Sequence, residues 1–125
     1  MITNIVSPTK AEATSTTQLM SLQRAAQACR LSIIEMLTAT QSSHLGSCFS
    51  IIDILVTLYH GVLDVELIKQ QRPERDYVIL SKGHAAAALY ATLASVGLIP
   101  HHMLATYQRG ILGGHPTRAP ELGIE

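Results

Sequence analysis

The feature that most constrains the fold is a short apolar run that passes through a glycine turn into an alanine-rich segment. Tyr77-Val78-Ile79-Leu80 is bounded by polar residues, which predicts a short buried strand. The turn Ser81-Lys82-Gly83-His84 follows, and a helix is predicted from about His84, with Gly97 as its cap. Such a passage presents free backbone amides and the positive end of the helix dipole, which suits a phosphate group.

On spacing alone the turn has two interpretations. In the first, His84 donates a hydrogen bond to an anion held at the start of the helix. In the second, the turn is an ordinary strand-to-helix connection and His84 is an exposed cap residue. Two further histidines, His44 and His115, also lie beside glycine, which lets a ligand or another backbone come close. Each is alternatively a loop histidine that bonds a backbone carbonyl.

Two other chemistries fit the histidines less well. His44, His84 and His115 are widely separated, and the chain has no His-x-x-x-His or Cys-x-x-Cys pair, so the signal for zinc is weak. No serine lies in a Gly-x-Ser-x-Gly turn, which argues against a serine hydrolase. The other histidines lie at or near predicted helix ends and are interpreted as surface or capping groups: His60, His101 and His102.

The rest of the chain is predicted to be helices joined by polar connections. The predicted segments are a polar, flexible leader over 1–14, a single domain over 15–125, helices over about 15–40, 50–61 and 101–109, a surface connection over 66–76, and an irregular end over 110–125. Ser15 and Gln18 are placed to form a capping box for the first helix. The helix over 50–61 is apolar on nearly every side, so we expect it to be enclosed.

Charge and cysteine usage narrow the class of partner. The chain has 9 basic and 9 acidic residues, no net charge and only 14% charged residues, so a nucleic-acid partner is not expected. Sparse charge favours a surface that packs against another domain or subunit. Cys29 and Cys48 are predicted to be small core residues. We expect neither a membrane span nor a secretory signal, and therefore a cytoplasmic protein.

Three motifs together resemble the N-terminal, pyrophosphate-binding domain of transketolases. Ser42-Ser43-His44-Leu45-Gly46 is similar to the family's first histidine loop, and the block from Arg75 to His84 is similar to its Arg-Asp-x-x-x-Leu-Ser-x-Gly-His motif. Gly114-His115-Pro116 is similar to its Gly-His-Pro turn. The resemblance covers about residues 20–125. Leu45 and Lys82 look closer to the N-terminal subunit of the split, two-subunit transketolases than to the full-length enzyme.

The resemblance implies a fold class and roles for the histidines. It implies an α/β, doubly wound, thiamine-diphosphate-binding domain, of which this chain is a mostly helical portion with about one strand. His84 is implied to lie near the cofactor diphosphate and the substrate hydroxyls, as a catalytic and cofactor-binding residue. His44 and His115 are implied to be catalytic, facing the reacting carbon and the sugar. Two departures loosen the match: Ser43 replaces a glycine before His44, and Leu122 replaces a proline.

The resemblance also implies a truncated domain. In the family, a Gly-Asp-Gly segment ending in Asn follows the position of Glu125 and holds Mg²⁺, a cation that prefers oxygen ligands. We therefore expect transfer of a two-carbon ketol unit between sugar phosphates only with further polypeptide, such as a C-terminal transketolase subunit or a homo-oligomer. Binding of thiamine diphosphate and Mg²⁺ by this chain alone is not expected. The alternatives are a non-catalytic relic or docking module, and a fragment resembling deoxyxylulose-phosphate synthase.

Overall fold

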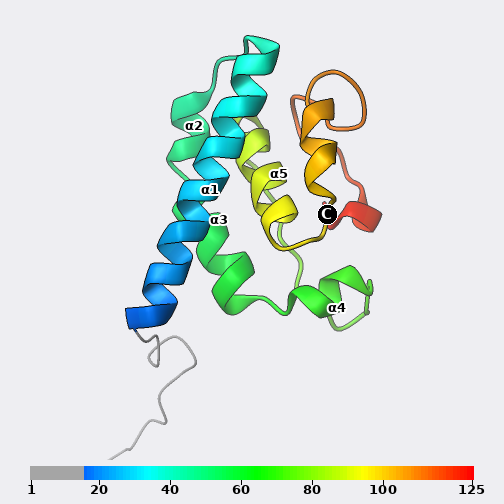
Figure 1. Cartoon of the computed structure of the whole chain (residues 1–125). Coiled ribbons are helices and arrows are strands. Elements are labelled where there is room, and N and C mark those ends of the chain that lie inside the picture. Colours follow the sequence, from blue (N-terminus) through cyan, green and yellow to red (C-terminus); the bar gives the residue numbers. More distant parts are fainter. Residues whose placement is uncertain (1–15) are drawn as a thin grey trace, which may run out of the picture.

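The longest helix, α1 (Thr16–Thr40), runs along one side of the molecule, and several of the other helices pack against it (Figure 1). The structure is a computed structural model that describes residues 16–125. The remaining elements are α2 (Leu45–Phe49), α3 (Ile52–Thr57), the π-turn η1 (Leu58–Val62), α4 (Val65–Lys69), the 3₁₀ turn η2 (Gly83–Ala85), α5 (Ala86–Ser95), and the 3₁₀ segments η3 (His101–Thr106) and η4 (Pro120–Leu122). The mostly helical portion that the resemblance implies is confirmed.

The apolar period of α1 confirms the first predicted helix. Its buried residues recur at steps of three and four: Ala26, Cys29, Ile33, Met36 and Leu37. They face α5 and α3, so this stripe is the seam of the core. Ser15 lies outside the described residues, and with it the predicted capping box and the predicted leader over 1–14. The predicted domain boundary stays a prediction.

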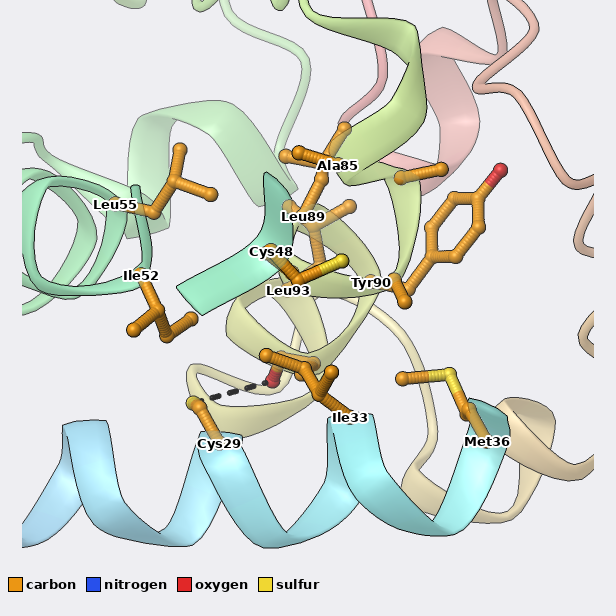
Figure 2. Close-up of a cluster of buried hydrophobic side chains, with 14 of the residues drawn as sticks. Cys29, Ile33, Met36, Cys48, Ile52, Leu55, Ala85, Leu89, Tyr90 and Leu93 are labelled. Carbon is orange, nitrogen blue, oxygen red and sulfur yellow. Dashed lines mark hydrogen bonds between the residues drawn. The ribbon is translucent and has the colours of Figure 1, made fainter. Parts of the chain in front are cut away.

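Alanine-rich α5 is the centre of the core (Figure 2). Its first eight residues are all buried, from Ala86 to Leu93. Small alanine side chains let the α1 backbone approach closely, and the Cys29 thiol donates a hydrogen bond to the Ala91 carbonyl at 3.7 Å. Both Cys29 and Cys48 are free and buried, which confirms their prediction as core residues. Each buried aliphatic side chain contributes about 1.5–3 kcal/mol.

The predicted helix over 50–61 corresponds to α3 and η1, which follow each other without a gap, but its predicted enclosure is wrong. The α-helix begins at Ile52 and ends as the π-turn η1, and its outward side chains remain open: Ile54 is 61% exposed and Val62 59%. By length and composition alone, the stretch Leu45–Val62 is apolar enough to cross a membrane, with a mean hydropathy of 1.5. In the structure Cys48, Ile52 and Tyr59 from this stretch lie in the core.

The predicted buried strand Tyr77–Leu80 is also not formed. The segment is extended, but no backbone hydrogen bond joins residues 77–80 to any other residue of the described chain. Val78 and Leu80 pack against the helical core, whereas Tyr77 is 55% exposed and Ile79 78% exposed. The alternation is that of a strand with one covered face. Within residues 16–125 no doubly wound sheet is present, because this extended segment has no second strand beside it.

The predicted connection over 66–76 contains a short helix, α4. The Asp64 carboxylate caps it by accepting hydrogen bonds from the backbone N–H groups of Glu66 and Leu67. The predicted helix over 101–109 is instead the 3₁₀ segment η3. The irregular end over 110–125 is confirmed apart from η4 and an isolated bridge between Ala119 and Ile124.

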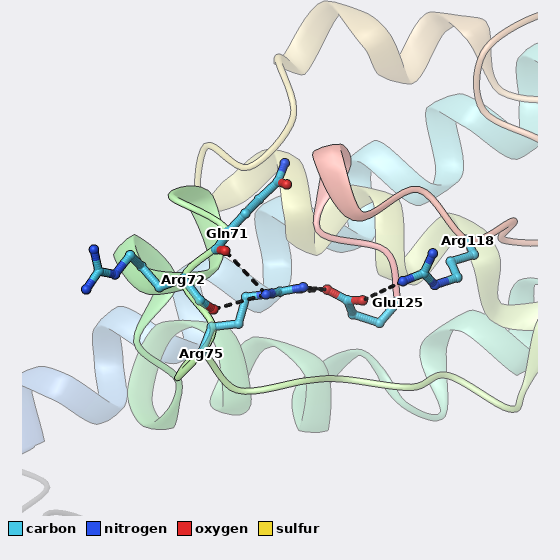
Figure 3. A network of polar contacts seen from close by, with 5 residues as sticks. All are labelled: Gln71, Arg72, Arg75, Arg118 and Glu125. Carbon is cyan, nitrogen blue, oxygen red and sulfur yellow. Dashed lines mark hydrogen bonds and ion pairs between the residues drawn. The ribbon is translucent and has the colours of Figure 1, made fainter.

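An ion pair joins the end of the chain to the connection before the extended segment (Figure 3). The Arg75 guanidinium donates to Glu125 Oε1 from Nε at 3.2 Å and from Nη2 at 2.8 Å. Both side chains are close to buried, at 11% and 8% exposed. Arg75 also donates from Nη1 to the carbonyls of Gln71 and Arg72. Glu125 raises the pKa of Arg75, mainly through this hydrogen bond.

Candidate functional site

The three predicted site histidines come together on the surface. The His44 and His84 rings stack with centroids 4.6 Å apart and an interplanar angle of 22°. His115 meets His84 edge-on at 5.3 Å. His44 precedes α2, His84 lies in η2 directly before α5, and His115 lies in the loop after η3. The structure thus brings together three residues from three separate segments, with His84 in the middle, and all three are exposed.

The backbone at His44 is in the left-handed region, with φ 75° and ψ 15°. This conformation is uncommon for residues other than glycine, although histidine adopts it more often than most. It ends the loop after α1 and starts α2, so it directs the imidazole toward His84. The positive φ values of this loop fall at Gln41 and His44, and Ser43 is exposed. The serine that replaces the family's glycine is therefore accommodated without left-handed strain.

His115 lies directly against the backbone of Gly83. A Cβ atom placed on Gly83 would come within 2.7 Å of His115 Cδ2, closer than any real contact. The loop before His115 is also tied to α5, because the buried Tyr90 hydroxyl donates to the Gly113 carbonyl at 2.9 Å. A glycine at position 83 is therefore what lets His115 approach His84.

Buried hydroxyl and thiol groups that keep their protons at neutral pH lie next to the histidine segments. Burial raises the pKa of Tyr90 to about 12, and burial also raises the pKa values of Tyr107 and the Cys48 thiol. The Cys48 thiol donates to the His84 carbonyl at 3.9 Å. At neutral pH these groups act as hydrogen-bond donors rather than as charges.

One cation lies at the same turn. The Lys82 ammonium donates to the Ser50 hydroxyl at 2.6 Å and is held between the end of α2 and the start of α3. No side chain caps either η2 or α5. The turn thus combines a lysine, a histidine and a helix start that has no side-chain cap, which are the features of an anion site.

The histidine rings do not have metal-ligand geometry. Among the described residues, no group of three histidine, cysteine, aspartate or glutamate side chains is placed to hold a metal ion. The zinc interpretation of His44, His84 and His115 thus gains no support from their geometry, which is that of stacked rings rather than of nitrogens converging on a point.

Sequence reasoning missed the residues that hold the histidine loops. The pattern around Tyr90 predicts only a helix, and no motif includes Gln108, which accepts a hydrogen bond from Ser42. Nothing in the local sequence identifies Gln108, since its contact spans 66 positions. The Tyr90 signal was available in principle, because a buried tyrosine hydroxyl needs a hydrogen-bond partner.

Comparison with known proteins identifies the domain. Residues 21–125 match the family described as transketolase, thiamine diphosphate binding domain. The chain is 37% identical over 107 residues to an apulose-4-phosphate transketolase subunit of Actinobacillus succinogenes, covering 83% of this chain and 39% of that protein. It is 36% identical over 110 residues to the 6-deoxy-6-sulfo-D-fructose transketolase subunit SqwG of Clostridium sp., covering 86% and 40%.

The same region is similar to single-chain transketolases. It is 35% identical over 101 residues to mouse transketolase, covering 79% of this chain and 16% of that protein. The chain therefore spans about two fifths of the subunits it matches and a smaller share of the single-chain enzyme. No solved structure gives a significant match. Since the family match includes all three histidine loops and most of the chain, this protein belongs to the transketolase family, and residues 21–125 match its thiamine-diphosphate-binding domain.

Proposed function

We propose that this chain contributes one side of a transketolase active site, which transfers a two-carbon ketol unit between sugar phosphates. The observation that carries the proposal is the His44–His84–His115 stack at the start of α5, in a domain whose family binds thiamine diphosphate. Two similar proteins are named as subunits of transketolases that act on sugar derivatives. The imidazoles hold and relay protons as the sugar carbon–carbon bond is broken and re-formed.

The turn at Lys82 to His84 fits a diphosphate. His84 supplies a donor, Lys82 supplies positive charge, and the positive end of the α5 dipole faces the same turn. Thiamine diphosphate, when bound, supplies the nucleophilic carbon that cleaves the bond. His44 and His115, on either side of His84, orient the sugar hydroxyls and move the proton. The described residues hold no cluster of carboxylates suited to Mg²⁺, so the proposal assigns no step to that ion in this chain.

We further propose that another polypeptide completes the domain into a doubly wound sheet. The extended segment 77–80 has unpaired backbone groups and exposes Tyr77 and Ile79, which supports pairing with a further strand. The names of the similar subunits support a partner subunit of a split enzyme. In this arrangement the partner polypeptide supplies the remaining cofactor-binding residues, so the cofactor site is complete only after assembly.

Reconstitution tests this function. Ketol transfer from a ketose phosphate to an aldose phosphate is measured with thiamine diphosphate and Mg²⁺, for the chain alone, with the polypeptide encoded beside it, and with a C-terminal transketolase subunit. Activity is expected only in a combination, and His84→Asn should lower it about 10²-fold or more. His102→Asn is the matched control, since this exposed histidine lies in η3 outside the stack. Inactivity in every combination would refute the proposal.

A second candidate, a non-catalytic docking module, is favoured by the exposed apolar side chains. Ile54, Ile79 and Ile111 are each more than 60% exposed and are therefore available for contact with a partner. Calorimetry with thiamine diphosphate separates the candidates once the partner is present: binding tighter than about 10 μM, roughly −7 kcal/mol, contradicts the docking module. Adding pyruvate and glyceraldehyde phosphate to the assay tests the synthase-like alternative at the same site.

A further inference from the structure

Gln108 begins the loop that carries His115. It follows η3 and adopts a left-handed backbone with φ 54°, and its N–H donates to the Leu112 carbonyl at 2.8 Å. A glutamine rarely takes this conformation, and the cost is accepted where surrounding contacts fix it. The turn sends the side chain toward the end of α1 instead of outward along the loop.

The Gln108 amide contacts both outer histidine loops. On one side its Oε1 accepts a hydrogen bond from the Ser42 hydroxyl at 2.7 Å, two residues before His44. On the other side a Cβ placed on Gly114 would lie 2.9 Å from Gln108 Nε2 and 3.3 Å from its Cγ, so the amide packs directly on the residue before His115. One side chain therefore touches the loop of His44 and the loop of His115.

A second contact strengthens the same junction. The Arg109 guanidinium donates to the Ala39 carbonyl in the last turn of α1. Ser42 itself shares a hydrogen bond with Thr40 at 2.6 Å. The loop that starts at Gln108 is thus fastened to the end of α1 at two neighbouring points, and the Gln108 contact is the one nearer to His44.

We infer that Gln108 is a positioning residue that sets the placement of His44 and His115 on either side of His84. The inference rests on the proposed function for its importance, but its physical content is a mechanical link between two loops. The His44 and His115 rings contact His84 with centroids 4.6 and 5.3 Å apart, and a shift of about 1 Å in a catalytic group can cost 10²-fold in rate.

Histidine-ring NMR of the unliganded chain tests the link without cofactor or partner. Gln108→Leu keeps the side-chain length and removes the amide. It should shift or broaden the ring ¹H–¹³C signals of both His44 and His115 while leaving His60 in place. Gln108→Glu keeps an oxygen that Ser42 can donate to, so its His44 signal should stay closer to the wild type.

The chain offers a matched control in Gln71→Leu. Gln71 has the same residue type and nearly the same backbone, with φ 53°, in the turn after α4. This variant should leave every site histidine unchanged. Ser42→Ala supplies the reciprocal test, because it should move His115 although the two residues are far apart in sequence. If Gln108→Leu is too unstable to fold, the effect of Ser42→Ala on the His115 signals tests the link between the two loops.

The NMR results test the link between the two histidine loops separately from the proposed ketol-transfer function. If Gln108→Leu moves only His115, and Ser42→Ala moves only His44, the two loops are independent and the inference is wrong. If both variants move both rings, it is supported, and the double variant should add little to the larger single effect. In the assembled enzyme, Gln108→Leu should then lower kcat at least about tenfold with little change in KM. If both variants shift both rings but the assembled protein has no ketol-transfer activity, the proposed function is wrong while the link between the two loops is supported.

Discussion

At the scale of single residues, Gly83 controls the approach of two histidines. The space that a Cβ would occupy is filled by the edge of the His115 imidazole, 2.7 Å away. Gly83→Ala should therefore swing His115 off His84 while the backbone stays in place, because the obstructing atom belongs to a movable side chain. We expect a change in unfolding free energy of less than about 1 kcal/mol, a clear shift of the His115 ring signals, and lower activity in the assembled enzyme.

The matched substitution for Gly83→Ala is Gly46→Ala. Gly46 lies in α2, two residues after His44, and a Cβ there meets nothing within 4 Å. Alanine favours a helix over glycine, so stability should stay the same or rise by up to about 1 kcal/mol. Its His115 signals should match the wild type. Equal shifts of His115 in both variants would contradict the steric explanation.

Two buried phenols make stability fall in alkali. Burial, together with the charge of Glu125, raises the pKa of Tyr59 to about 12, and burial raises that of Tyr90 equally. Since the folded pKa exceeds the unfolded value near 10, the stabilisation is complete below pH 10 and is lost as the pH rises toward 12. Each ionising tyrosine should add about 1.4 kcal/mol per pH unit to the loss.

Urea unfolding at pH 8 and pH 11 measures this loss. Tyr59→Phe should make the decrease between the two pH values smaller than in the wild type. Tyr77→Phe is the control, because Tyr77 is 55% exposed and its ring remains available to the Arg75 guanidinium. An identical decrease in wild type and Tyr59→Phe would show that this phenol does not carry the pH dependence.

At the scale of elements, the segment 77–80 has the extended backbone of a strand but pairs with no other strand in the described part of the chain. Val78 and Leu80 cover the helical core, while Ile79 points outward and is 78% exposed. Ile79→Lys should leave the unfolding free energy within about 0.5 kcal/mol of wild type. Burial of an isoleucine is worth about 1.5–3 kcal/mol, so the same change should weaken the binding of a completing polypeptide about tenfold or more.

Hydrogen exchange provides the second measurement on this segment. The amides of residues 77–80 should exchange rapidly in the chain alone and become protected on assembly, since pairing with a new strand is what would bond them. Leu80→Ala serves as the contrast, because its side chain packs on the core and its loss should lower stability itself. Unchanged exchange on assembly would place the partner elsewhere.

The sequence predicted well what depends on local pattern. The stripe of α1, the buried cysteines and the helix cap at Gly97, with φ 75°, follow from periodicity and from glycine's backbone freedom. It predicted less well what depends on distant contacts. A strand forms only beside another strand, so Tyr77–Leu80 could be recognised as extended but not as unpaired.

The candidate site shows the same division. His44, His84 and His115 could be predicted because each has a glycine within two residues and because their motifs resemble a family. Their stacking distances were not predictable, and neither was the role of Gln108, because its contact with Ser42 joins loops 66 positions apart.

At the scale of the whole molecule, the Arg75–Glu125 pair fastens the last residue to the connection that leads toward His84. Two hydrogen bonds to one oxygen, with both side chains close to buried, make this pair unlike the exposed Arg30–Asp53 pair, whose aspartate is 68% exposed. A guanidinium left unpaired in a partly buried place is costly, whereas an exposed pair contributes little. Glu125→Gln should therefore lower Tm by several degrees, and Asp53→Asn by about 1 °C or less.

Thermal unfolding in low and high salt separates this ion pair from simple packing. Salt should reduce the small effect of Asp53→Asn and leave most of the effect of Glu125→Gln, because close-to-buried charges are screened less. Arg118→Gln is the nearest control, since its guanidinium lies 4.0 Å from Glu125 Oε2 and is 73% exposed. If Arg118→Gln and Glu125→Gln lowered Tm equally, the contribution would come from the general charge of the C-terminal segment. If Glu125→Gln lowered Tm more than Arg118→Gln does, the stabilisation would come from the contact between Glu125 and Arg75. In that case Glu125→Gln should also speed up hydrogen exchange at residues 75–83, which connect this ion pair to the histidine stack.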